Sequence, residues 1–265
     1  FLLEEQRQTP EESLQFPKDA NMGEPHPAII QYTPGTRMSY SSAGYTILQL
    51  LIEELTGKAF NEYMKEHVLQ PLTIQYATYD TEELVAQHRA DQLVPNYDSE
   101  LNIHPHRKHT MMAGGSLRIT PHEMGLFLQA YLQERLLTQS TIQSMLQPQP
   151  GTGSTWGLGH EIYLNDSSKR IAGHGGGAFP RTGASFRVNT STGNAIALMM
   201  TGGTEMIDPY MKAWMYWETG QYAFDIREAF HKRIRHIGMV TILGAILIIG
   251  WQVRIGKRKS TRDAG

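Results

Sequence analysis

The 265-residue chain contains no cysteine, which excludes disulfides, thiol chemistry and cysteine-ligated metal sites. Its charge is nearly balanced, with a formal net charge of −2 at pH 7, so the basic footprint of a nucleic-acid-binding protein is missing. No signal peptide is recognisable, because Phe1-Leu2-Leu3 is followed at once by Glu4-Glu5. The first residue is also not methionine, and we expect the natural N-terminus to lie further upstream.

Long apolar runs are missing from most of the chain, with one exception over residues 237–253. Its 17 residues reach the lower end of the roughly 17 to 25 that a helix needs to cross a membrane. Basic residues flank the run on both sides, and Trp251 lies where an interfacial aromatic belongs. We therefore expect a transmembrane helix rather than a buried core helix.

This expectation divides the chain into four parts. Residues 1–225 form the main domain, 226–236 a basic juxtamembrane linker, 237–253 the transmembrane helix and 254–265 a basic tail. The tail is slightly richer in lysine and arginine than the linker, which favours a cytoplasmic C-terminus. The main domain is then expected outside the cytoplasmic membrane.

Helices are predicted in the first part of the main domain. Ile47, Leu48, Leu51 and Leu55 fall on one helical face, with a cap at Ser41 or Ser42 and a stop at Gly57. Three further helices are expected over residues 59–69, 120–132 and 140–146. The third of the four begins with the capping-box pattern Thr120-Pro121-His122-Glu123.

Strands are predicted after residue 150. The pattern indicates strands over residues 156–164, 184–188 and 195–200, with a turn over residues 189–194 that pairs the last two. Helices followed by an antiparallel meander indicate an α+β architecture. The expected fold is an antiparallel sheet flanked by helices, with a helical subdomain.

Two short motifs stand about 130 residues apart in this order. Tyr40-Ser41-Ser42-Ala43-Gly44-Tyr45 opens the first predicted helix, which ends in Thr56-Gly57-Lys58. His174-Gly175-Gly176-Gly177 precedes the paired strands. Between them stands Met112-Ala113-Gly114-Gly115-Ser116-Leu117.

These motifs resemble those of the β-lactamase-related serine hydrolases, which include penicillin-binding proteins, class C β-lactamases, D-alanyl-D-alanine carboxypeptidases and esterases. In that family Tyr-Ser-Asn-x-Gly-Tyr opens a helix that ends in Thr-Gly-Lys. An Ala-Gly-Gly-Leu segment follows, and then Lys-Thr-Gly or His-x-Gly on a strand that lines the site. The resemblance covers roughly residues 30–203 and implies the β-lactamase/transpeptidase-like fold.

The resemblance also implies roles for particular residues. Tyr40 would relay a proton between nucleophile, lysine and leaving group, and His174 would be one of the cations beside it. One backbone N–H among Gly175, Gly176 and Gly177 would serve the oxyanion hole. Ser42 stands where asparagine is common, and its shorter hydroxyl favours substrates other than β-lactams.

The nucleophile is missing from the sequence. The family's Ser-x-x-Lys occurs nowhere in the chain, and Ser167-Ser168-Lys169 has the wrong spacing. We interpret the chain as the C-terminal part of a membrane-anchored bacterial cell-wall hydrolase that acts through an acyl-enzyme on D-alanyl peptides, β-lactams or small esters. Alone, it is expected to be inactive. The alternative is a nucleophile-free, membrane-tethered module that binds peptidoglycan or another partner.

Two other chemistries are disfavoured. His-Gly-Gly-Gly is also an oxyanion motif of α/β-hydrolases, but the Gly-x-Ser-x-Gly elbow they need is missing from the sequence. His104, His106 and His109 could approach a divalent metal, but Arg107 and Lys108 lie among them and the cluster has no acidic residue. We predict no metal and no cofactor. The sequence leaves the oligomeric state open.

Overall fold

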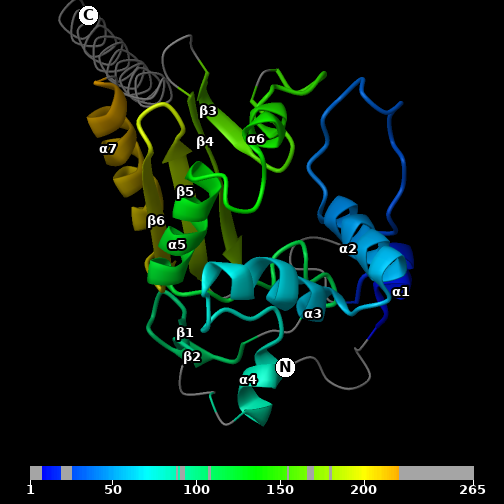
Figure 1. Ribbon diagram of the computed structural model, residues 1–265. Coiled ribbons are helices and arrows are strands. Elements are labelled where there is room, and N and C mark those ends of the chain that lie inside the picture. Colours follow the sequence, from blue (N-terminus) through cyan, green and yellow to red (C-terminus); the bar gives the residue numbers. More distant parts are fainter. Residues whose placement is uncertain are drawn as a thin grey trace, which may run out of the picture. The chain divides into compact units, whose positions relative to one another are not determined.

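The computed structural model describes residues 8–18, 26–87, 89, 93–106, 109–153, 155–165, 170–178 and 181–220 (Figure 1). Two compact units divide the chain, Phe1–Met211 and Lys212–Gly265, and every predicted site residue belongs to the first. The predicted linker, transmembrane segment and tail lie outside the described residues. None of the helices in the described ranges combines the length and apolar character that crossing a bilayer takes.

Helices are the main regular elements of the described chain before residue 150. They are α1 (Pro10–Gln15), α2 (Ser42–Thr56), α3 (Phe60–Met64), α4 (Thr81–Ala86), α5 (Pro121–Leu132) and α6 (Gln139–Met145). A π-helical turn (Lys65–Leu69) and a 3₁₀ turn (Gln70–Leu72) extend α3. A further described helix, α7 (Ile207–Thr219), begins in the first unit and continues into the second. The predicted helices over residues 59–69, 120–132 and 140–146 are thereby confirmed.

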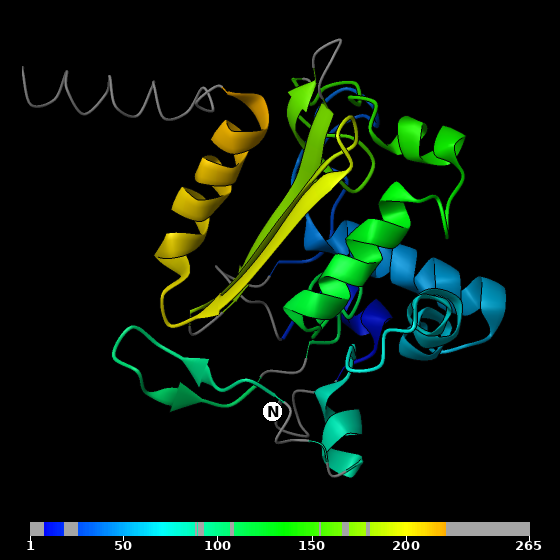
Figure 2. The ribbon, with the colours of Figure 1, turned by 60° about the vertical axis from the view of Figure 1, so that its left-hand side comes forward.

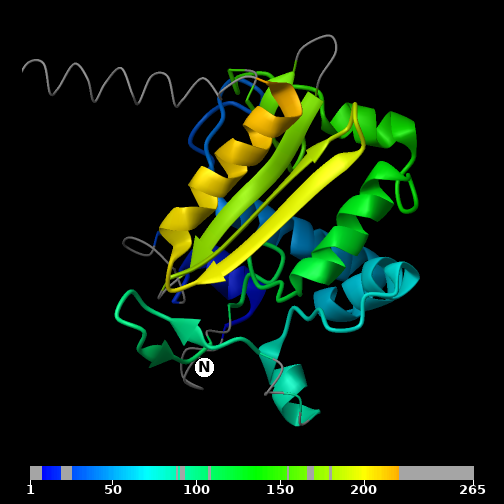
Figure 3. The same ribbon diagram turned by 90° about the vertical axis from the view of Figure 1, so that its left-hand side faces the viewer.

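The second half contains a four-stranded antiparallel sheet in the order β3-β4-β5-β6. Its strands are β3 (Glu161–Asn165), β4 (Arg170–Ala178), β5 (Thr182–Asn189) and β6 (Asn194–Thr201). A hairpin of β1 (Asn96–Tyr97) and β2 (Ile103–His104) lies at one end of the sheet (Figure 3), where the Tyr97 N–H donates to Thr201 Oγ1 (2.7 Å). The predicted α+β architecture is confirmed.

The strand predicted over residues 156–164 is shorter in the structure. The Gly157 N–H donates to the His160 carbonyl (2.9 Å), so the chain turns there and β3 begins only at Glu161. Trp156 stays connected to the start of β3 by an isolated bridge with Glu161. A turn therefore replaces the first half of the predicted strand.

Two buried clusters hold the helices and the sheet. One lies in the helical region and is built from Leu69, Leu72, Ile74 and Ala130. In the other, Ile142 and Leu146 from α6 and its C-terminal end pack with Ala172 of β4. The second cluster places the end of α6 on the strand that also contains His174. Helix α5 runs beside β6, the strand at the opposite end of the order from β3 (Figure 2).

Helix α2 has the predicted bounds, but its apolar face is exposed and a polar face is buried. Gly57 ends α2 in the left-handed conformation (φ 66°), as predicted. Its buried residues, however, are Thr46 and Gln49. The apolar face predicted from the sequence is exposed, at 54% for Ile47, 51% for Leu48, 50% for Leu51 and 77% for Leu55. The opposite, polar face lies inward, where the Gln49 Oε1 accepts the Ala113 N–H (3.2 Å).

The predicted capping box of α5 is only half formed. Thr120 is the N-cap and its Oγ1 accepts the Glu123 N–H (3.1 Å). The Glu123 carboxylate instead accepts the N–H groups of Gln75 (2.6 Å) and Tyr76 (2.7 Å). This buried carboxylate therefore ties the loop after the 3₁₀ turn to α5, which stabilises the helical region.

Candidate functional site

Tyr40 lies in the extended segment immediately before α2. Its side chain is 64% exposed. Two residues earlier, the Met38 N–H donates to the Gly151 carbonyl (3.2 Å), which fixes this segment to the turn after α6. Ser41 is the N-cap of α2, but its side chain makes no capping hydrogen bond. The predicted serine cap is therefore wrong in its chemistry, although the helix begins where expected.

His174 lies in the middle of β4, opposite Phe186 of β5. Its imidazole ring lies 6.2 Å from the phenol ring of Tyr40, centroid to centroid, with 34° between the planes. The fold thus brings together two residues that are 134 positions apart in the sequence.

On the side of β4 that faces away from β5, the described strand pairing stops at this histidine. Pairing between β3 and β4 ends with Glu161 opposite Gly173. From His174 onward, no described strand pairs with β4 on that side. In an antiparallel arrangement every second residue points its N–H and C=O toward such an edge. The edge beside Tyr40 can therefore bind an extended acyl or peptide group through its backbone.

The glycines of β4 differ in what surrounds them. A methyl group on Gly173 would lie 2.0 Å from the Phe186 carbonyl oxygen, so packing within the sheet requires glycine there. A methyl group added at Gly176 would meet nothing within 4 Å, and one added at Gly175 or Gly177 would make only ordinary contacts, at 3.6 Å and 3.4 Å. All three are exposed. Glycine at these positions leaves room for a molecule from outside, which is the property an oxyanion site needs.

Ser42 is the first residue of α2 and is exposed. Its position two residues after Tyr40 places it at the same helix end. Its hydroxyl has a shorter reach than the amide of asparagine. The role of Ser42 stays a prediction.

Trp156 is a site residue that the sequence reasoning missed. Its indole ring lies 5.8 Å from the ring of Tyr40 and 5.5 Å from that of His174. The sequence pattern predicts Trp156 as the first residue of a strand. The nearby glycines Gly157 and Gly159 could have indicated a turn, since glycine weakens a strand interior.

Charges and burial shift the pKa of groups near Tyr40, Trp156 and His174. Burial raises the pKa of Tyr45, and the proximity of Tyr40 adds to the rise. Burial lowers the pKa of His160, against a hydrogen bond with the Leu158 carbonyl, and His174 lowers it further. His160 also lies 5.4 Å from the ring of Tyr131, a phenol whose pKa burial raises to about 12. Near neutral pH, these shifts favour the uncharged forms of Tyr45, His160 and Tyr131.

The histidine cluster that we considered for metal binding makes other contacts. His104 Nε2 lies 2.8 Å from the Asp98 carboxylate, within the β1–β2 hairpin. His106 Nδ1 lies 3.2 Å from the Asn96 amide. In the described ranges no group of three potential ligands is arranged to hold a metal ion. These contacts give His104 and His106 a structural role in and beside the hairpin.

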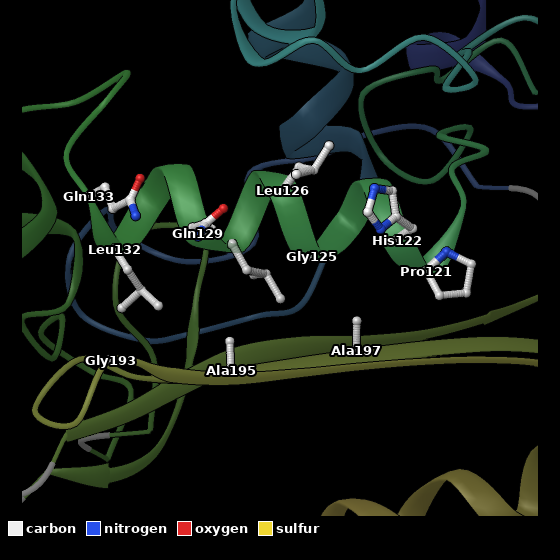
Figure 4. Close-up of a pocket in the computed structure, with 11 residues that line it drawn as sticks. Pro121, His122, Gly125, Leu126, Gln129, Leu132, Gln133, Gly193, Ala195 and Ala197 are labelled. Atoms are coloured by element: carbon white, nitrogen blue, oxygen red, sulfur yellow. The ribbon is translucent and has the colours of Figure 1, made fainter.

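A groove of about 650 Å³ lies between α5 and β6 (Figure 4). Pro121, Gly125, Gln129, Ala195 and Ala197 are among the residues that line it. None of the predicted site residues does so. The open edge beside Tyr40 and His174 remains the better candidate, because the motif residues converge there.

Comparison with known proteins adds the family. The model of the family described as Beta-lactamase matches residues 12–217. The putative penicillin-binding protein PbpX of Bacillus subtilis is 26% identical over 140 residues, which are 50% of this chain and 33% of that protein.

Solved structures share the fold. The octameric penicillin-binding protein homologue from Pyrococcus abyssi is 22% identical, with a TM-score of 0.57 over 74% of this chain and 44% of that one. The D-amino acid amidase of Ochrobactrum anthropi SV3, solved with L-phenylalanine amide, is 21% identical, with a TM-score of 0.53 over 72% of this chain and 61% of that one. The chain thus spans between about a third and three fifths of the length of these proteins.

Proposed function

This chain belongs to the beta-lactamase family, and we propose that it is the C-terminal part of a serine hydrolase that works through an acyl-enzyme. Its substrates would be D-alanyl peptides, β-lactams or small esters. One observation carries the proposal: the phenol ring of Tyr40 lies beside the imidazole of His174 where an edge of β4 is open. Its similarity in fold to a penicillin-binding protein homologue and a D-amino acid amidase supports an amide substrate.

Tyr40 is the proton relay in this proposal. Acyl transfer through serine needs a group that takes the hydroxyl proton and returns one to the leaving group. A tyrosine can do this near neutrality only where positive charge stabilises its phenolate. His174, with its ring 6.2 Å away, would supply part of that charge when protonated.

The oxyanion donor would come from the glycine stretch. A backbone N–H of Gly175, Gly176 or Gly177 that points to the open edge of β4 can donate to the developing oxyanion. The space beside these glycines lets a substrate carbonyl approach the strand. Ser42 would contact the substrate next to Tyr40, and its short side chain favours an ester or peptide over a β-lactam.

The nucleophile and its lysine would come from a further segment of the same protein. The Ser-x-x-Lys pattern is absent from these 265 residues, and the chain spans only 33% of PbpX. The exposed apolar face of α2 supports a missing neighbour, because Leu51 and Leu55 would gain by being covered. This face belongs to the helix that starts just after Tyr40.

Labelling of the full-length protein tests this proposal. A fluorescent penicillin or a fluorophosphonate should label a serine upstream of Phe1, and mutating that serine should abolish the label. The 265 residues alone should neither label nor hydrolyse. A gene that starts at Phe1, with no Ser-x-x-Lys before it, would contradict the proposal.

Tyr40→Phe tests the proton relay. Removing the hydroxyl should lower the turnover of an ester or D-alanyl peptide by about 10²- to 10⁴-fold, the range typical of a lost acid–base group. The exposed ring stays in place, so the midpoint of thermal unfolding should not change. Near-wild-type turnover would remove Tyr40 from the mechanism.

The missing nucleophile also favours a second candidate, a non-catalytic module that binds peptidoglycan peptides or another partner. In that case the open edge of β4 would bind the peptide without cleaving it. Binding of a D-alanyl-D-alanine peptide to the full-length protein, with neither labelling nor hydrolysis, would identify it.

We further propose that residues 237–253 anchor the protein in the cell membrane with the hydrolase domain outside the cytoplasm. The apolar run and its basic flanks support this. Protease treatment of intact cells tests it: the domain should be digested from the outside. Protection of the domain until the cells are lysed would contradict the proposed location.

A further inference from the structure

The backbone of Trp156 is held from both directions along the chain. Its carbonyl accepts the Gln149 N–H (2.8 Å). On the other side, the Ile162 N–H donates to the Thr155 carbonyl (2.7 Å), and Trp156 itself bridges to Glu161. The loop between α6 and β3 is therefore closed on itself, and the indole leaves it from a fixed point.

This loop is also packed tightly against the end of α6. The Leu158 N–H donates to the Met145 carbonyl (2.8 Å). A methyl group on Gly157 would lie 2.1 Å from the same oxygen, so only glycine allows this approach. Trp156 therefore cannot move outward without breaking the contact between its own loop and the helix.

The same loop fixes the segment that contains Tyr40. Gly151 accepts the Met38 N–H (3.2 Å) and has a positive φ of +76°. A methyl group there would lie 2.8 Å from the Thr36 carbonyl oxygen. One short turn, from Gln149 to Gly151, thus holds both Trp156 and the strand-like segment that leads to Tyr40.

Little else described in the structure orients the ring of Tyr40. It is 64% exposed, and the side chain of the following N-cap, Ser41, makes no capping hydrogen bond. Its ring contacts are with Trp156 at 5.8 Å and 55° and with His174 at 6.2 Å and 34°. The indole in turn meets the imidazole at 5.5 Å and 67°. Such tilted aromatic contacts restrict both rings.

We propose that Trp156 is a positioning residue that fixes the phenol of Tyr40 beside the imidazole of His174 and so orients the proton relay. This inference rests on the proposed function, since it concerns the reaction in which Tyr40 would move the proton. The loop clamps the indole, the indole limits the swing of the phenol, and the hydroxyl stays within reach of the reacting groups. Orientation of this kind contributes to turnover more than to binding.

Kinetics of the full-length protein test the role. Trp156→Ala should lower kcat by about 10- to 100-fold, as expected for a misplaced catalytic group, and change KM by less than about threefold. Trp156→Phe keeps a ring in the same place and should retain most of kcat. Leu158→Ala is the matched control, because Leu158 belongs to the same loop and is 52% exposed. It should leave kcat unchanged.

A double mutant separates positioning from direct substrate contact. In the Tyr40→Phe background, Trp156→Ala should lower kcat by less than about threefold, because the hydroxyl it positions is gone. If Trp156 touched the substrate instead, its full effect would persist in that background. Should Trp156→Ala fail to fold, Trp156→Leu preserves apolar bulk without a ring and should show the same fall in kcat.

The outcomes keep the two proposals apart. A protein in which Tyr40→Phe abolishes turnover while both Trp156→Ala and Trp156→Leu keep full kcat overturns the positioning role alone. A protein that neither labels nor hydrolyses any substrate overturns the proposed function, and the positioning role falls with it. A full effect of Trp156→Ala in the Tyr40→Phe background also overturns the role proposed here.

Discussion

Tyr40 and His174 meet in the structure, but the regions that hold them are built in opposite ways. His174 belongs to β4, where Ile171 and Ala172 are fully buried and each residue from Ile171 to Ala178 pairs with β5. Tyr40 leads into α2, where polar Thr46 and Gln49 are buried. The apolar residues Ile47, Leu48, Leu51 and Leu55 of this helix are exposed. The histidine side thus rests on an apolar core, and the tyrosine side rests on hydrogen bonds.

The hydrogen bonds made by α2 form a short structural network. Gln49 is 2% exposed, and its Oε1 accepts the Ala113 N–H (3.2 Å). Its Nε2 approaches Glu53 Oε1 (3.5 Å), which also accepts the Phe60 N–H (3.0 Å). Because buried polar groups must be paired, this network of hydrogen bonds decides which face of α2 turns inward. The apolar face is left for another surface.

Ile171→Ala and Leu51→Ala test this contrast most strongly. Ile171 is 0% exposed, so its truncation should lower the free energy of unfolding by about 4 kcal/mol. Leu51 is 50% exposed, and its truncation in the 265-residue chain should cost no more than about 0.5 kcal/mol. Urea unfolding of both variants measures the difference.

The same pair also tests whether α2 has a missing neighbour. In the full-length protein Leu51→Ala should cost about 2 kcal/mol or more if a further segment covers this face. An equally small cost in both proteins would mean that the face stays exposed. A small cost for Ile171→Ala would show that β4 is not part of a tightly packed core.

Two glycines of β4 provide the next test. Gly173→Ala should destabilise the protein by about 3 kcal/mol, because the methyl group would lie 2.0 Å from a backbone oxygen that cannot easily move. Gly176→Ala meets open space and should change stability by no more than about 0.5 kcal/mol. Thermal unfolding distinguishes them, and similar losses at both positions would contradict the assigned surroundings.

The smallest expected effects concern pH. Burial lowers the pKa of His160 in the folded protein, so the unfolded chain takes up the proton first. Stability should be lost as pH falls below the ordinary value of 6.5. On α2, burial raises the pKa of Tyr45, so the unfolded chain releases its proton first and stability should be lost as pH rises above 10.

Matched substitutions check both directions of the pH effect. His160→Gln should flatten the acid limb of the stability curve, and Tyr45→Phe should flatten the alkaline limb. Each should leave the opposite limb unchanged, since the two groups titrate in separate ranges. An acid limb that keeps its slope in His160→Gln would show that other groups cause it.

Local rules predicted several parts of the fold correctly. Gly57 ends α2 because glycine adopts the left-handed conformation without strain, and Thr120 caps α5 through its hydroxyl. The alternation of apolar residues gave β5 and β6 with the turn between them. Each of these features depends on neighbours within a few residues, so the sequence pattern contains the information.

Distant contacts explain what the sequence did not predict. Glu123 fits a capping box, yet its carboxylate binds amides 47 and 48 residues away. The apolar face of α2 is exposed, and the buried residue is Gln49, whose Oε1 accepts the Ala113 N–H from 64 residues away. In each case a partner far along the chain overrides the local preference.

The sequence by itself determined the residues of the two motifs, their order, the α+β pattern and the absence of Ser-x-x-Lys. These are properties of residue identity and short-range periodicity, which the chain contains before it folds. Only the tertiary structure decided that the phenol of Tyr40 and the imidazole of His174 lie side by side, each in contact with the indole of Trp156. It also decided that the edge of β4 is unpaired by any described strand at that point. These depend on how distant segments pack, because ring contacts and strand edges exist only when the sheet and the loops are assembled.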